Sequence, residues 1–220
     1  HSRMYFVELQ AAQSWTDSAG AARAGPLLAA TWDRTGRAWG FNYKLEAIAP
    51  QFRARAGFVS RVGVVEMHAS NRLTFYGRRG ALLETATAFI SDRRVFAWDD
   101  FALDRALEGS DGVTTTWTLR GGWSLAAGAT RSFYQFERDR YAAYGVLDGA
   151  DTAAFAVPDR LDGLYSGSLR ASTPVFRTFS ASVSANLDQT AIFLEAAEGR
   201  QSRLSATLNA MIARLEQSFS

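Results

Sequence analysis

The sequence contains no cysteine, which excludes a disulfide framework and thiol-based zinc or redox chemistry. Only four prolines occur in 220 residues. This is typical of a chain that lies mostly in hydrogen-bonded strands, which proline would interrupt. No segment approaches the roughly 18 consecutive apolar residues of a transmembrane helix. If the chain enters a membrane, we expect it to do so as a β-barrel.

The charge of the chain is nearly balanced, with 24 basic and 22 acidic residues and a formal net charge of +2. No dense basic stripe emerges, so a nucleic-acid partner is not expected. The sequence opens at His1-Ser2-Arg3 without a methionine or a signal-peptide pattern. We therefore interpret residues 1–220 as one β-barrel domain that is an internal or C-terminal segment of a longer precursor.

The clearest pattern is a strict alternation along residues 37–47. Every second side chain is apolar or aromatic, in the order Trp39, Phe41, Tyr43, Leu45 and Ala47. Because successive side chains of a strand point to opposite faces, this stretch predicts a strand with one apolar and one polar face. A transmembrane β-strand has the same division between a lipid-facing side and a lumen-facing side.

Similar alternation recurs along the chain and predicts about ten strands. The predicted connections alternate between long and short: residues 16–25, 49–60, 95–112 and 137–160 read as long loops, and residues 33–36, 77–80 and 120–122 and the turn at Pro174 as short turns, with a last polar bend at 195–200. Short turns on one side and long loops on the other are typical of outer-membrane barrels, whose short side is periplasmic. We predict an all-β, antiparallel, up-and-down transmembrane β-barrel, of which this segment is part.

Several segments resemble a known family. The match includes Phe41-Asn-Tyr-Lys-Leu45, Phe52 and Ala56-Gly-Phe-Val-Ser-Arg61, and extends to the segments 5–14 and 120–125. These segments are similar to the C-terminal barrel region of the domain-of-unknown-function family 5916. The family motif residues here are Gly57, Phe58, Val59 and Arg61. Ser60 stands where the family often has proline.

The resemblance implies an outer-membrane protein of a Gram-negative type envelope. Family members often carry an N-terminal domain that is like a family 9 carbohydrate-binding module. The implied partners are the lipid bilayer, lipopolysaccharide and, through an upstream domain, glycans. No catalytic residues are carried over from the family, and no cofactor or metal is expected.

Five charged or titratable side chains fall on the polar faces of two predicted strands, and we expect them to line the lumen: Lys44, Glu46, Glu66, His68 and Arg72. Opposite charges across a lumen wall can select solutes. The other interpretation, which we favour, is that they are solvated or mutually paired wall residues that keep a barrel rigid. Trp39, Tyr43, Trp117 and Trp123 are expected to form an aromatic girdle at the membrane interfaces.

Two further functions remain open. His68 and Ser70 share a face, and Asp99 and Asp100 are adjacent carboxylates, so an exported glycan-active hydrolase with the barrel as its carrier is one alternative. A soluble β-sandwich or lipocalin-like binding module is the other. We favour a non-enzymatic, porin-like role, as a channel or as the membrane anchor of an exported carbohydrate-binding module.

Overall fold

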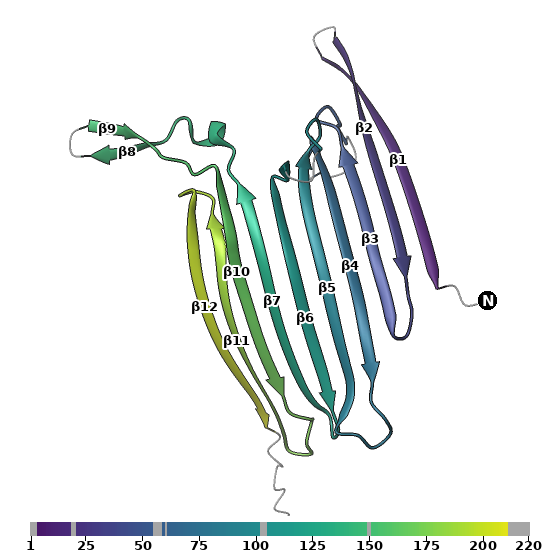
Figure 1. The fold of residues 1–220 in the computed structure, drawn as a ribbon. Helices are drawn as coiled ribbons and strands as arrows, with labels where there is room; N and C mark the ends of the chain where they lie inside the picture. Colours follow the sequence, from purple (N-terminus) through teal and green to yellow (C-terminus); the bar gives the residue numbers. More distant parts are fainter. Residues whose placement is uncertain are drawn as a thin grey trace, which may run out of the picture.

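The chain forms one long antiparallel sheet of ten strands (Figure 1). The computed structural model describes residues 4–18, 21–54, 59, 61–101, 105–148 and 151–210. Strands that are neighbours in the sheet also follow one another along the chain. Their order is β1-β2-β3-β4-β5-β6-β7-β10-β11-β12. The all-β, antiparallel, up-and-down arrangement predicted from the sequence is therefore confirmed. The strands are β1 (Tyr5–Ser18), β2 (Ala21–Arg34), β3 (Trp39–Ile48), β4 (Val64–Tyr76), β5 (Leu83–Ala97), β6 (Glu108–Leu119), β7 (Trp123–Gln135), β10 (Arg160–Ser172), β11 (Phe179–Ile192) and β12 (Ala197–Ala210).

A small hairpin interrupts this order between β7 and β10. It consists of β8 (Gly145–Asp148) and β9 (Asp151–Ala154), preceded by the short 3-10 helix η2 (Arg138–Tyr141). Figure 1 shows that it projects away from one end of the large sheet.

The register gives the sheet two chemically different faces, because residues paired across antiparallel strands share a face. Leu45 pairs with Ala30 on one side and with Met67 on the other. Continuing these pairs across the sheet defines an apolar face, whose large side chains include Val7, Leu9, Leu28, Trp32, Tyr43, Leu45, Met67, Leu73, Phe75, Ile90, Val113, Trp117, Leu125, Leu169, Val183, Leu187, Leu204 and Leu208. The opposite, polar face carries Glu66, His68, Arg93, Thr114, Thr116, Ser132, Ser166, Ser168, Ser184, Asn186, Ser205 and Thr207.

The two ends of the sheet also differ. One end, called the short-turn end here, holds the connections 35–38, 77–82, 120–122 and 173–178. The other, the long-loop end, holds the connections 49–63, 98–107 and 136–159. Gly121 and Gly122 both have positive φ values, of 87° and 86°. Glycine adopts this left-handed backbone without the steric cost of a Cβ, which explains the tight reversal predicted at residues 120–122.

The predicted alternation of long and short connections fails at the first and last hairpins. Residues 16–25 were expected to be a loop, but β1 and β2 pair from Tyr5–Arg34 to Ser18–Ala21. The small and polar composition of this stretch resembles a loop, yet its described residues continue the two strands as far as Ser18 and Ala21. The last bend is also short, because β12 already begins at Ala197. Likewise, β5 extends to Ala97 and β6 begins at Glu108, so the third loop is shorter than predicted.

Buried side chains concentrate at the long-loop end. Phe136, Tyr141 and Ala196 form one small cluster there, to which Phe155 and Val157 pack from the β7–β10 connection. Ile48, Ala49, Phe52 and Val64 are also buried, beside the β3–β4 connection. The sheet itself ends in two edge strands, β1 and β12, which do not pair with each other within the described residues.

Candidate functional site on the polar face

The five residues predicted to line a lumen all lie on the polar face of β3 and β4. Lys44 pairs with His68 and Glu46 pairs with Glu66 across these strands. Lys44 Nζ also contacts Glu46 Oε2 at 3.0 Å. The shared face that the alternation predicted is confirmed, whereas the use of that face as a lumen remains a prediction.

An arginine of the next strand connects this group to a larger charge network. Arg93 Nε donates to Glu66 Oε1 at 2.8 Å, and Arg93 Nη1 contacts Glu108 Oε1 at 3.2 Å. Glu108 opens β6, so one guanidinium joins three consecutive strands. Charge-assisted hydrogen bonds of this kind are shorter and stronger than neutral ones.

The network continues into the long-loop end through Arg61. Arg61 Nη1 contacts Glu108 Oε1 at 3.2 Å, and Arg61 Nη2 lies 3.8 Å from Glu137 Oε1. Glu137 in turn accepts from Arg140 Nε at 2.8 Å. Acidic and basic groups therefore alternate from β4 to η2. The arrangement ties two long connections to the sheet and places a dense but nearly neutral group of charges at one end of the polar face.

Arg72 lies apart from this network. Its guanidinium donates to Thr74 Oγ1 at 2.9 Å and to the carbonyl of Gly36, at the short-turn end. Glu66 and Arg72 are six residues apart on one strand, a separation of about 20 Å. The five candidates therefore share a face but do not form one site.

Sequence reasoning missed Arg93 and Glu108, which are the centre of the network. Arg93 shares its face with Thr85, Thr87 and Ser91, but also with Phe89, which interrupts the polar row and weakens the alternation of this strand. Glu108 precedes Gly-Ser-Asp-Gly, a composition that indicated a loop. Both residues would have been found by extending the period-two pattern of β5 and β6 to their ends.

The family motif is only partly described. Gly57 and Phe58 lie outside the described residues, and Val59 is half-buried. Arg61 has the clearest role, because it bridges Glu108 and Glu137.

Comparison of the chain with protein-family models, with curated proteins and with solved structures gave no match. Among the described residues, no helix has the length and apolar character needed to cross a membrane. Membership of the resembled family therefore stays a prediction, and what the site can do has to be inferred from its geometry.

The four expected girdle residues all lie on the apolar face. Trp39, Trp117 and Trp123 are close to the short-turn end, at the beginning or end of their strands. Tyr43 lies nearer the middle of β3, where its ring stacks on Phe41 with centroids 4.6 Å apart. Three of the four thus lie near the same end of the sheet, and the fourth does not.

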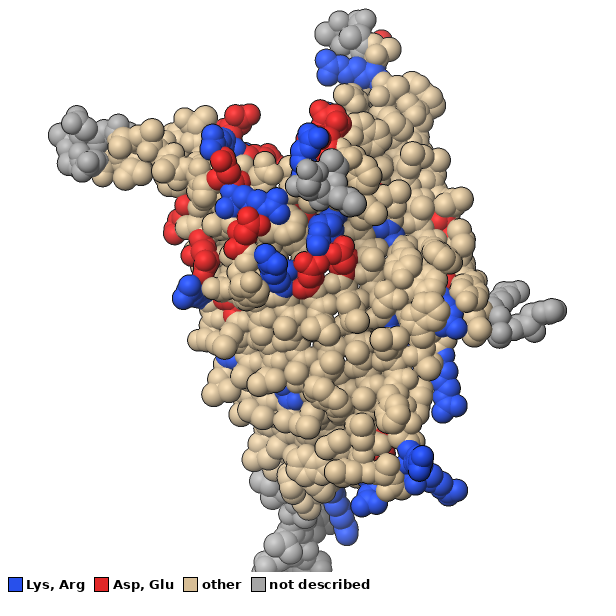
Figure 2. All heavy atoms as spheres, in the orientation of Figure 1, with Lys and Arg blue, Asp and Glu red and all other residues tan. Residues whose placement is uncertain are grey.

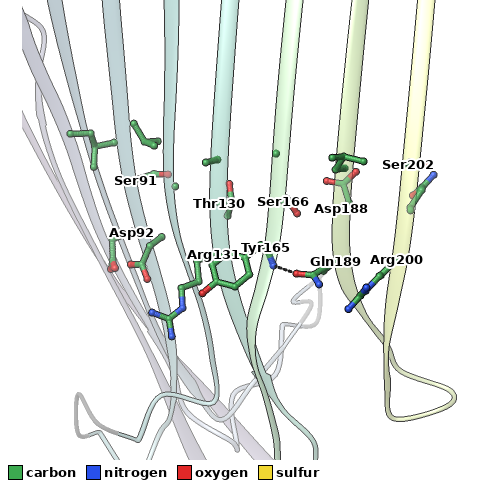
Figure 3. A pocket seen from close by; sticks show the side chains of 18 residues that line it. Ser91, Asp92, Thr130, Arg131, Tyr165, Ser166, Asp188, Gln189, Arg200 and Ser202 are labelled. Carbon is green, nitrogen blue, oxygen red and sulfur yellow. Dashed lines mark hydrogen bonds between the residues drawn. The ribbon is translucent and has the colours of Figure 1, made fainter.

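A second group of charges lies on the apolar face toward the long-loop end. Arg94 contacts Asp92 at 2.8 Å and Asp111 at 2.7 Å, and Asp111 pairs with Arg131 in the register. Asp92, Asp111 and Arg131 line a hollow of about 980 Å³ that crosses β5, β6, β7, β10, β11 and β12. Figure 3 shows Asp92, Arg131, Tyr165, Gln189 and Arg200 in one row across these strands, with the backbone amide of Tyr165 donating to Gln189.

The residues of the hydrolase alternative are not arranged for catalysis. Ser70 is buried and its hydroxyl donates to the carbonyl of Asn42 at 3.4 Å, whereas a nucleophile needs contact with its base. Asp100 is bound to Arg105, with Asp100 Oδ1 and Arg105 Nη1 2.8 Å apart. Neither group forms the convergent set of acid, base and nucleophile that hydrolysis requires.

Proposed function

We propose that the chain is part of an outer-membrane β-barrel that acts as a channel or as the membrane anchor of an exported carbohydrate-binding module. The observation that carries the proposal is the exposure of the apolar face across the sheet. Leu9, Leu169, Leu204 and Leu208 are 77%, 64%, 78% and 70% exposed. Full burial of one such side chain is worth about 1.5–3 kcal/mol in water, so a face of this kind is stable only against an apolar layer.

The dimensions of the apolar face suit a bilayer. Along β7, Trp123 and Phe133 bracket Leu125, Ala127, Ala129 and, next to Phe133, the charged Arg131. Ten residues of strand span about 33 Å. With the tilt of about 40° that barrel strands adopt, this corresponds to a layer of about 25 Å, the height of the apolar band of such barrels.

The proposed barrel requires partners for the two edge strands of the sheet, β1 and β12. In lipid, the backbone groups of an edge strand must be paired, because no water is present to bond them. β1 and β12 run in opposite directions, so they can pair antiparallel with each other or with further strands of a longer chain. Either arrangement encloses the hydroxyl-rich polar face as a lumen and leaves the apolar face toward lipid.

The charge distribution supports this orientation. Figure 2 shows that charged residues gather at the end from which the β8–β9 hairpin projects, and that the middle of the viewed surface carries few charges. The lipid bilayer and lipopolysaccharide are the partners that this orientation implies. The family resemblance adds the carbohydrate-binding module, and hence the anchor role.

Heat-modifiable migration on a gel, combined with planar-bilayer recording, tests the proposal. A folded barrel should remain compact in mild detergent and migrate faster before boiling than after. Stable ohmic steps would identify a channel, and heat modifiability without conductance would identify an anchor. A chain that is monodisperse without detergent would contradict the proposal and favour the soluble binding module.

A further inference from the structure

The short-turn end carries a one-sided charge. Its four connections, residues 35–38, 77–82, 120–122 and 173–178, contain five arginines and no acidic residue: Arg37, Arg78, Arg79, Arg120 and Arg177. All five are exposed. Figure 2 shows basic side chains at the end opposite the β8–β9 hairpin.

These arginines differ from those at the long-loop end in their partners. Every ion pair among the described residues lies in the half of the sheet nearer the long loops, and none includes a turn arginine. The Arg37 guanidinium lies over the Tyr76 ring at 4.5 Å, and Arg120 donates to the carbonyl of Gly80 at 3.0 Å. Neither contact neutralises the charge, so the end remains positive.

A row of aromatic side chains lies next to these turns on the apolar face. Trp39, Phe75, Trp123 and Phe179 are exposed there. Phe176 of the last turn packs between two of them, with its ring centroid 6.4 Å from Trp123 and 4.7 Å from Phe179. Aromatic rings followed outward by cations match the order of layers in an anionic membrane, in which acyl chains give way to negatively charged headgroups.

We propose that the short-turn end binds the headgroups of anionic phospholipids through its turn arginines. This inference rests on the proposed membrane function and names the lipid class that one rim of the barrel recognises. Charge complementarity selects the partner, because unpaired guanidinia form bidentate hydrogen bonds with phosphate oxygens. The aromatic row fixes the depth at which the arginines meet those headgroups.

Tryptophan quenching by brominated lipids tests this binding. The whole chain is reconstituted in vesicles that contain brominated phosphatidylglycerol or brominated phosphatidylcholine, and the relative association constant is measured. The unsubstituted chain should prefer phosphatidylglycerol at least about fivefold, since each arginine near an anionic surface contributes about that factor. The preference should decrease at high salt, which screens exposed charges.

The decisive comparison uses two triple variants with the same change of charge. Arg78→Gln, Arg79→Gln and Arg177→Gln together should lower the preference at least about fivefold, leaving only Arg37 and Arg120 at this end. Arg105→Gln, Arg138→Gln and Arg140→Gln, at the long-loop end, should retain it. Equal preferences in both variants would overturn the inference while leaving the barrel intact. If neither lipid quenches fluorescence and the chain is soluble without detergent, the proposed function itself is wrong, and this inference falls with it.

Discussion

The two faces of the sheet solve the same folding problem in opposite ways. On the polar face, charged groups find partners within the chain, as Arg93 does with Glu66 and Glu108. On the apolar face, Leu169 and Leu208 stay exposed and depend on whatever surrounds the sheet. The polar face can therefore be understood from this chain alone, while the apolar face has to be understood together with its environment.

The largest effect should come from placing a charge on the apolar face. Ala88→Arg introduces a guanidinium between Leu73 and Thr115. In a bilayer this should cost about 2–4 kcal/mol near the midplane. The matched control is Thr87→Arg, one residue away on the polar face, which should cost less than about 1 kcal/mol. Urea unfolding of the vesicle-inserted protein measures both, and equal losses would contradict a lipid-facing assignment.

A smaller effect should follow from opening the charge network. Glu108 is the shared acceptor of Arg61 and Arg93, and its side chain is only 17% exposed. Glu108→Gln removes the negative charge that Arg61 and Arg93 share. We expect this to lower the free energy of unfolding by about 1–2 kcal/mol. The isosteric Glu46→Gln serves as the control, because within the described part of the chain Glu46 is bound only to exposed Lys44. A loss at Glu46 as large as that at Glu108 would show that the network has no special role.

The smallest effect is expected for the ion pair between Lys44 and Glu46 on the polar face. A double-mutant cycle on Lys44 and Glu46 should give a coupling of about 0.2–0.5 kcal/mol, because the two side chains are 50% and 36% exposed to solvent. The coupling should vanish in about 1 M salt, where the screening length is about 3 Å. A coupling that survives high salt would indicate a dry environment around the pair.

Alternation predicted the faces well because side-chain direction in a strand depends only on sequence spacing. The row from Trp39 to Ala47 and its polar counterpart at Lys44 and Glu46 are where the pattern placed them. The same reasoning explains the order of hairpins around residues 77–82 and 120–122, where glycines mark the turns.

The pattern could not reveal which side chains meet across strands. The contact of Arg93 with Glu66 depends on register, which a single strand does not encode. Composition was also misleading where small polar residues continue a strand, as in residues 16–25. Arg177 stands two residues before Phe179, at the spacing of the apolar row, but β11 begins only at Phe179, so Arg177 belongs to a turn.

The neighbour-to-neighbour order of the strands also has a kinetic consequence. Each sheet contact forms between segments that are close along the chain, so the sheet can grow one hairpin at a time with little loop-closure entropy. The exception is the pairing of β7 with β10. It requires closure of the long connection 136–159, which contains the β8–β9 hairpin. We expect that step to divide folding into an early seven-strand unit and a late three-strand unit.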